Sequence, residues 1–405
     1  MGFFHPLAKD ALNITVVAAL ILTATLALSY QENVIEWIRV NRVLWLTFLL
    51  LCLLAATSSV VTGGSLSTVR DVVLISGVAL LGIVLSVLRP PEAVLSGLVA
   101  GATIVATYGW VFRIIDGVPL GGLEISSLHE FEGVGLNQGY EAFSALVGVA
   151  SALGLLKSGP RKSFLAVLPG GFLAFTLLFT GSIYGWFALG GLLLLFISIS
   201  AFRESKSRIA RVAIISVNAA YVGVLASAMI FQSWTLSLTA EFGKATTLEA
   251  RFLSWGHVFD VIGPWGAAIG HGAHFWEQGS VWRENFSGLI TQDGYGPFSH
   301  SHNEFIDLFL AFGVLGVPLV GVFLGHVVSN ASRAWREKRK WILYTTPWFF
   351  FVILSIQGLG TTVLVSRPAG WFLAGALAGI FAFRDPSQNR PLEWAPSGSN
   401  RRPTD

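Results

Sequence analysis

Long apolar runs alternate with short polar segments along the whole chain, which is the pattern of a protein that crosses a membrane repeatedly. Most runs approach the length of about 20 residues that a helix needs to span a bilayer. Helices are expected because lipid leaves backbone polar groups no outside partner. The predicted fold class is therefore all-α, a polytopic membrane helix bundle of about 11–12 spans with one long, partly helical external loop. Eleven spans are placed at Ala11–Leu28, Val43–Val61, Val72–Leu88, Val94–Phe112, Tyr140–Leu156, Phe164–Thr180, Tyr184–Ala201, Val212–Phe231, Phe305–Val327, Trp341–Val363 and Gly370–Phe383.

The composition agrees with this pattern. The 405 residues are 53% hydrophobic and 12% charged, about half the charge of a typical soluble domain. Cys52 is the single cysteine, which excludes an intrachain disulfide and cysteine-ligated metal. The net charge of +3 does not indicate nucleic-acid binding, because the basic residues lie in short loops between spans.

Lysine and arginine are distributed unevenly between the two sets of loops. Nineteen fall on one side of the predicted spans and seven on the other. The positive-inside rule puts the first set in the cytoplasm. The segments 113–139 and 232–301 are then external, and the Pro-, Ser- and Arg-rich tail Asp385–Asp405 is expected to be disordered.

The external segment 232–301 begins with the signals of an amphipathic helix. Thr246 and Glu249 fit a capping box, apolar residues follow at spacings of three and four, and Gly263-Pro264 stops the pattern. Arg251 lies near one flank of the apolar face. Its guanidinium either reaches toward lipid headgroups or binds an anion.

A glycine- and histidine-rich stretch, "GAAIGHGAHFWEQG" (Gly266–Gly279), follows. Glycines permit tight turns and the close approach of a backbone to a ligand. A loop that needs positive φ at these positions would have the same composition. Both interpretations stay open at the level of sequence.

The segment ends on "PFSHSHNEFIDLFLAFGVLGV" (Pro297–Val317), which runs two histidines into an apolar helix. Ser301 and Glu304 fit a second capping box, which predicts Ser301 as N-cap and His302 as the first helical residue. Unpaired N–H groups and the positive dipole end at such a start favour an anion and a neutral imidazole. His302 is a candidate general base, or else an interface-anchoring histidine.

Two polar residues follow His302 one turn apart. Asn303 and Asp307 are spaced i,i+4 and are predicted to face each other. Asp307 lies inside an apolar run, where an ionisable residue is a functional candidate.

The order of these motifs resembles the O-antigen ligase and polymerase superfamily of bacterial inner membranes. The resemblance rests on an Arg-bearing helix, "ARFLSWGHVFDVIGPWGAAIGHG", followed by "SHNEFIDLFLAFGVLGV". Upstream, "GLNQGYEAFSALVG" (Gly135–Gly148) is similar to an Asn-containing family segment, and "LFTGSIYGWFALGG" (Leu178–Gly191) lies where the family has a T-x-S-R turn. The spacing of "HFWEQG" and "SHN" is closer to the exopolysaccharide-polymerase branch. The pattern covers about Gly135–Phe383, and the first four spans match only by hydropathy.

The resemblance implies an enzyme that needs no metal, nucleotide or other cofactor. Family members transfer a glycan from undecaprenyl diphosphate to a sugar hydroxyl, on lipid A-core in ligases or on a growing chain in polymerases. The family's essential histidine falls on His302 and its loop arginine on Arg251. The implied location is the inner membrane with a site that faces the periplasm.

One position departs from the family pattern. The basic residue of the T-x-S-R turn is replaced by Ile183. A second contact to the diphosphate is then expected from Arg283 or Arg367, both on external segments. Asn137 and Asn303 complete the candidate substrate-binding residues.

Three other classes of function remain open. A transporter or flippase of lipid-linked glycans would more typically carry charges or broken helices near mid-membrane, and spans one to eight are nearly free of charge. A zinc enzyme is weighed because five of the eight histidines lie in the long loop, although no H-E-x-x-H motif is present. A non-catalytic assembly protein would not need the combination of Arg251, the G-x-G turn and His302-Asn303.

These predictions divide the chain into five parts. Four N-terminal spans occupy 1–112, and an external loop with four middle spans occupies 113–231. The long periplasmic loop with the candidate site is 232–304. The last three spans are 305–383, and the cytoplasmic tail is 384–405.

Overall fold

The structure is a computed structural model. It describes residues 21–61 except 23 and 27, then 66–115, 138–157, 160–180, 182–205, 207–230, 255–256, 258, 262–272, 303–337 and 341–358. The predicted span Gly370–Phe383, the first part of Ala11–Leu28 and the tail from Asp385 lie outside the described residues. The five-part division of the chain stays a prediction.

Every regular element in the described part of the chain is a helix. The helices are α2 (Gln31–Val40), α3 (Arg42–Val61), α4 (Leu66–Leu88), α5 (Pro91–Ile115), α6 (Gln138–Leu155), α7 (Pro160–Leu178), α8 (Ile183–Glu204), α9 (Arg208–Ile230), α12 (Gly263–Ile269), α14 (Glu304–Arg336) and α15 (Trp341–Gln357).

Four of these helices are long and apolar enough to cross a membrane: α3, α5, α8 and α14. Shorter apolar helices at Ser76–Leu88, Glu141–Leu155, Ala166–Leu178 and Trp341–Gln357 coincide with further predicted spans. The prediction of an all-α polytopic membrane protein is therefore confirmed, while the total of eleven spans remains a prediction.

Helix α2 is an element that the span predictions do not contain. It is amphipathic, with Trp37 buried and Ile35 exposed. Asn41 separates α2 from α3, and its side-chain amide donates to the Trp37 carbonyl at 3.0 Å. A helix of ten residues is too short to register as a span, so a search for apolar runs misses it.

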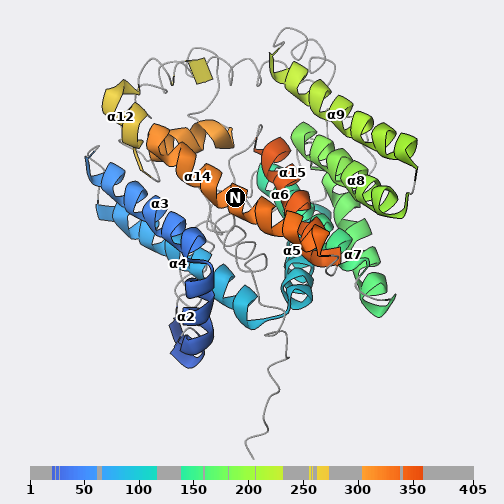
Figure 1. Ribbon diagram of the computed structural model, residues 1–405, viewed down its shortest axis with the longest axis horizontal. Helices are drawn as coiled ribbons and strands as arrows, with labels where there is room; N and C mark the ends of the chain where they lie inside the picture. Colours follow the sequence, from blue (N-terminus) through green and yellow to red (C-terminus); the bar gives the residue numbers. More distant parts are fainter. Residues whose placement is uncertain are drawn as a thin grey trace, which may run out of the picture.

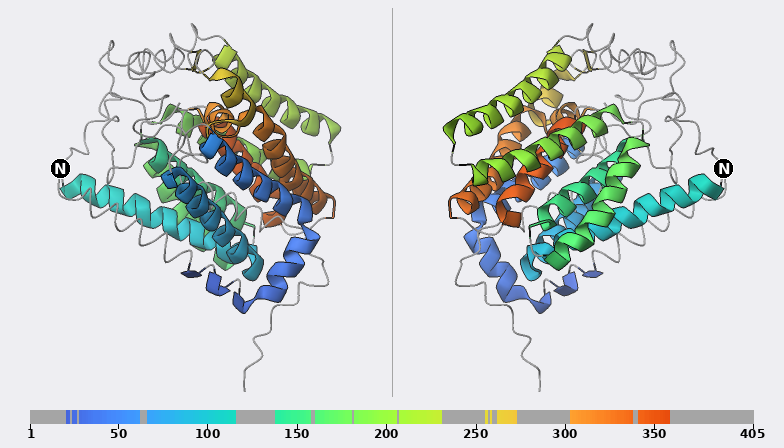
Figure 2. Two further views of the ribbon diagram at one scale, coloured as in Figure 1. Left: turned by 90° about the vertical axis from the view of Figure 1, so that its left-hand side faces the viewer. Right: turned by 90° about the vertical axis from the view of Figure 1, so that its right-hand side faces the viewer.

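The helices form one bundle in which α14 and α15 lie near the centre (Figure 1). In that view α2, α3 and α4 lie on one side, and α7, α8 and α9 on the other. Helix α6 packs against α5, α7 and α15, and α14 packs against α3, α12 and α15. Figure 2 shows the same helices from both sides. The largest fully buried core side chains on α6, α7 and α15 are Leu146, Leu173, Leu177, Ile342, Phe349 and Phe350.

Small residues allow α5, α6 and α7 to approach closely. A Cβ atom on Gly148 would lie 2.4 Å from Leu173 Cδ1 and 2.7 Å from the Ala102 Cβ. Membrane helices associate through such close packing, because lipid provides little hydrophobic drive between them. Gly148 therefore sets the spacing of three helices at once.

Helix α14 is broken at Gly313, where φ is 61° and ψ is −169°. The break divides it into an N-terminal arm, residues 304–312, and a longer part, residues 314–336. Pro318 lies in the longer part, and the non-helical φ and ψ are those of Gly313 itself. The arm carries the segment that follows the candidate base His302.

Gly148→Ala is expected to lower the free energy of unfolding by about 1–3 kcal/mol, because the added methyl overpacks a core that cannot retreat from the Ala102 methyl. Gly101→Ala on α5 is the matched control. Nothing lies within 4 Å of its added Cβ, so the gain in helix propensity should leave stability equal or slightly higher. Thermal unfolding of purified protein in detergent measures both. Equal melting temperatures for the two variants would contradict this packing.

Candidate functional site

Most of the predicted site residues lie outside the described residues. These are Asn137, Arg251, Arg283, His302 and Arg367. Asn303 is described and buried. The site is therefore built from Asn303 and from the elements that meet around it.

Asn303 is the N-cap of α14. Its backbone is extended (φ −144°, ψ 113°), and its side-chain oxygen accepts from the N–H groups of Phe305 at 3.0 Å and Ile306 at 3.2 Å. The prediction that Ser301 caps this helix is wrong. Asparagine caps as well as serine does, and the helix begins at Glu304, so His302 directly precedes the cap residue instead of opening the helix.

All four N–H groups of the first helical turn are bonded within the protein. Besides the two that Asn303 accepts, the Glu304 N–H donates to the Gly358 carbonyl at 2.7 Å, and the Asp307 N–H donates to the Asn303 carbonyl at 2.9 Å. The prediction of unpaired N–H groups at this helix start is therefore wrong. An anion at this end meets the helix dipole and side chains, but the backbone donors of residues 304–307 are already occupied.

Two carboxyl groups are buried in the same turn. Glu304 is 2% exposed and Asp307 is 0% exposed, and both lie where the positive end of the helix dipole favours negative charge. Gln357, the last residue of α15, is also buried. The start of α14 and the end of α15 thus form a buried polar junction, adjacent in the chain to His302.

The glycine-rich stretch after α12 pairs with the broken part of α14. Gly270 and Gly272 have φ of 77° and 81°, which agrees with the interpretation of this stretch as a loop that needs positive φ. The His271 N–H donates to the Leu310 carbonyl at 2.7 Å, and the Gly272 N–H donates to the Ala311 carbonyl at 3.0 Å. The close approach that these glycines permit is made to the backbone of α14.

The helix predicted to end at Gly263 is confirmed where it is described. Residues 255, 256 and 258 are helical, and Trp255, Val258 and Ile262 are buried. The chain turns at Gly263, with φ of 64°, and then forms the short helix α12. The stop at Gly263-Pro264 is thus also a new helix start, since proline suits the first turn.

The His271 side chain packs against α12 and the residue that precedes it. Its Nε2 lies 3.4 Å from the Ile262 carbonyl oxygen, and a Cβ atom on Gly266 would lie 2.2 Å from the same nitrogen. Burial lowers the pKa of the His271 imidazole below its usual range, against a smaller raising effect of the contact with the Ile262 carbonyl. Among the described residues, no group of three or more His, Cys, Asp or Glu side chains is arranged to hold a metal ion.

The turn between α7 and α8 is fixed by hydroxyl groups. Ser182 is the N-cap of α8, and its side chain accepts from the Gly185 N–H at 3.1 Å. Thr180 is buried beside it and donates to the Leu177 carbonyl at 2.8 Å. Ile183, which replaces the family's basic residue, is the first residue of α8.

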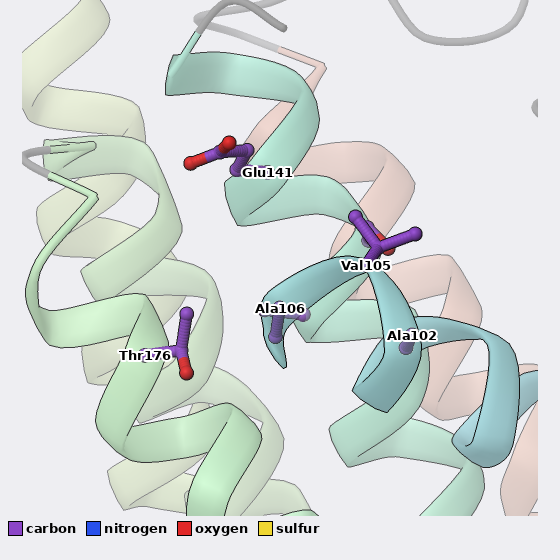
Figure 3. A pocket seen from close by; sticks show the side chains of 7 residues that line it. Ala102, Val105, Ala106, Glu141 and Thr176 are labelled. Carbon is purple, nitrogen blue, oxygen red and sulfur yellow. The ribbon is translucent and has the colours of Figure 1, made fainter. Parts of the chain in front are cut away.

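A small pocket lies between α5, α6 and α7 (Figure 3). Glu141 and Thr176 face it from α6 and α7, and Ala102, Val105 and Ala106 of α5 close another side. Glu141 is buried in the first turn of α6. The sequence interpretation missed this carboxyl, although an acidic residue one turn into an apolar span is the signal that identifies it.

His271→Gln tests the burial of this imidazole through the dependence of stability on pH. The pKa is lowered in the folded state, so only the unfolded chain takes up the proton as pH falls below about 6.5. This stabilising contribution is complete above that value and is lost as pH falls through the folded pKa. The melting temperature of the wild type should therefore drop more between about pH 7.5 and about pH 5 than that of His271→Gln. Parallel pH profiles of the two proteins would contradict a buried, neutral His271.

Part of the chain matches the model of a known protein family. Residues 146–321 match the family model described as O-Antigen ligase, Wzy_C. The matched region contains α8, α9, α12, the glycine turn and the arm of α14, together with Arg251, Arg283 and His302. No curated protein matches the chain. The resemblance deduced from the motifs is confirmed over residues 146–321: the chain carries an O-antigen ligase family domain there, which indicates a glycosyltransferase-like membrane enzyme.

Proposed function

We propose that this protein transfers a glycan from undecaprenyl diphosphate to a sugar hydroxyl on the periplasmic face of the bacterial inner membrane. The family match over residues 146–321 carries the proposal, because it spans the segment in which Arg251, the glycine turn and His302 follow one another. The apolar helices fit a lipid-linked donor, since such a substrate reaches its enzyme from within the bilayer.

The proposed chemistry divides between two side chains. His302 takes the proton of the acceptor hydroxyl as that oxygen attacks the anomeric carbon of the donor glycan. A new glycosidic bond forms, the bond to the diphosphate breaks, and undecaprenyl diphosphate leaves with the electron pair. Arg251 balances the negative charge of the leaving group through paired, charge-assisted hydrogen bonds.

The bonded first turn of α14 limits what else can hold the diphosphate. Its four N–H groups are occupied, so backbone donors there do not share the negative charge. Ile183 removes the family's second cation from the α7–α8 turn. Arg251 must then act with Arg283 or Arg367, which are our candidates for the second contact.

The two asparagines have different roles in this proposal. Asn137 precedes α6 and contacts the substrate. The side-chain oxygen of Asn303 is committed to the cap of α14. We therefore assign Asn303 first to holding the helix start beside His302, and its contribution to substrate binding is secondary.

His302→Ala should lower the rate of glycan transfer by a factor of about 10² to 10⁴, because general-base catalysis typically supplies that much. The assay uses purified protein with the lipid-linked donor extracted from the native host, with and without EDTA. Wild-type transfer should persist in EDTA, since the proposed mechanism uses no metal. His300→Ala is the matched histidine control and should retain most of the activity.

The role of Arg251 is tested in the same assay. Arg251→Lys should lose much of the activity, because lysine lacks the planar fork that grips a diphosphate, and Arg251→Ala should lose more. Full activity of His302→Ala, or abolition of wild-type transfer by EDTA, would refute the proposal. Equal losses of transfer activity in His302→Ala and His300→Ala, together with inhibition by EDTA, would favour the zinc enzyme. Variants that lose transport of the lipid-linked glycan but keep glycan transfer would favour a flippase.

The proposed orientation places Ser280 in the periplasm and Ser332, near the end of α14, toward the cytoplasm. Single cysteines at these positions, in a Cys52→Ser background, test it. An impermeant thiol reagent should label Ser280→Cys but not Ser332→Cys in spheroplasts, because the nineteen basic residues of the inner loops hold that side in the cytoplasm. A permeant reagent should label both. The reverse pattern with the impermeant reagent would overturn the orientation.

A further inference from the structure

The break in α14 is completed by backbone from a different part of the chain. At Gly313 the helix leaves helical geometry, with φ of 61°. A break of this kind removes helical partners from carbonyls in the preceding turn. In lipid such groups must find partners inside the protein. The N–H groups of His271 and Gly272 supply them for Leu310 and Ala311.

Glycine is required on both sides of this crossing. A Cβ atom on Gly270 would lie 2.4 Å from the carbonyl carbon and oxygen of Ala311. A Cβ atom on Gly313 would lie 2.5 Å from the Ala268 carbonyl carbon and oxygen. These contacts are with backbone atoms, which cannot move aside as the end of a flexible side chain does. We call this contact between residues 270–272 and 310–313 the glycine crossing.

The glycine crossing also reaches α3. A Cβ atom on Gly272 would lie 1.9 Å from the Ser59 hydroxyl oxygen. The hydroxyl of Ser58 lies 3.5 Å from the Ala311 carbonyl oxygen that Gly272 also contacts. The crossing is therefore enclosed between α14 and α3, and it fixes the C-terminal end of the arm.

The other end of the arm is fixed by α15. The Glu304 N–H donates to the Gly358 carbonyl at 2.7 Å, and a Cβ atom on Gly358 would lie 3.0 Å from the Glu304 Cβ. The nine residues 304–312 span about 13 Å of helix. A short helix bonded at both ends has little freedom to shift along its axis or to turn about it.

We propose that Gly270, Gly272 and Gly313 are positioning residues for glycan transfer: the glycine crossing fixes the arm of α14 and, through Asn303, the place of His302. This inference rests on the proposed role of His302 as the base. The three glycines touch neither the donor nor the acceptor. They act through backbone placement, so their effect on the rate should be exerted through His302 alone.

Gly270→Ala and Gly313→Ala should each lower the transfer rate by about 10²-fold. Either methyl must push the two backbones apart by about 1 Å, and a displacement of that size at a catalytic group costs about that factor. Gly263→Ala is the matched control, because φ is also positive at Gly263, 64°, but nothing lies within 4 Å of the added Cβ. Its transfer rate should be within about threefold of the wild-type rate, because the variant has the strain of a positive φ but does not displace a neighbouring backbone. Gly321→Ala, in the open second part of α14, should match the wild type.

A double-mutant cycle separates positioning from a loss of fold. In the His302→Ala background, Gly270→Ala should cost less than about threefold, because the group that it displaces is already gone. An equal 10²-fold loss in both backgrounds would mean that Gly270 only supports the fold, and it would overturn the proposal. Wild-type transfer by folded Gly270→Ala or Gly313→Ala would overturn it as well.

Hydrogen exchange of the full-length protein gives a readout that does not depend on activity. Amides of residues 303–312 should exchange faster in Gly270→Ala and Gly313→Ala than in Gly263→Ala, while those of α8 should not change. Unchanged exchange in the arm would overturn the glycine crossing as its anchor. If His302→Ala instead proves fully active while the arm exchanges faster as expected, the proposed function fails and the anchoring role of the crossing stands.

Discussion

The need to satisfy backbone carbonyls inside a membrane bundle governs this site. An unbroken helix meets that need by itself, but α14 is broken at Gly313. The structure restores the missing bonds with His271 and Gly272, from a segment about forty residues earlier in the chain. These hydrogen bonds bring the segment that follows α12 against α14 and α3. The position of the arm follows from those two hydrogen bonds and from the bond between the Glu304 N–H and the Gly358 carbonyl.

The bonded start of the arm changes the electrostatics that a helix terminus usually provides. Its N–H groups are occupied, and Glu304 and Asp307 place two buried carboxyl groups in the first turn. Such a terminus favours negative charge of its own and is poorly suited to a diphosphate. In our proposal Arg251, acting with Arg283 or Arg367, balances the negative charge of the leaving group.

The sequence predicts the fold far better than it predicts the local geometry of the site. Apolar runs locate α3 or α8 to within a few residues, because hydropathy in a bilayer is a local property. The cap of α14 is misplaced for the opposite reason. The bond from Glu304 to the carbonyl of Gly358 joins positions more than fifty residues apart, and no capping pattern contains it. The positive φ of Gly270 is predictable from composition, whereas its partner Gly313 is not, since each glycine alone looks like an ordinary turn or a helix interruption.

Ile183 and the glycine crossing both bear on how the proposed mechanism places its cations relative to its base. Where the resemblance to the family leads us to expect a basic residue at the α7–α8 turn, this chain has an apolar one, so the remaining candidate cations all lie on segments that we predict to be external. A positive charge on such a segment can assist the reaction only if the base has a fixed position relative to it. In our proposal the glycine crossing connects the two, because the segment that follows Arg251 in the chain bonds directly to the arm, and the arm begins two residues after His302 in the sequence. In our proposal a change at Gly313, which carries no charge, therefore acts on catalysis through distance, whereas a change at Arg251 acts through charge.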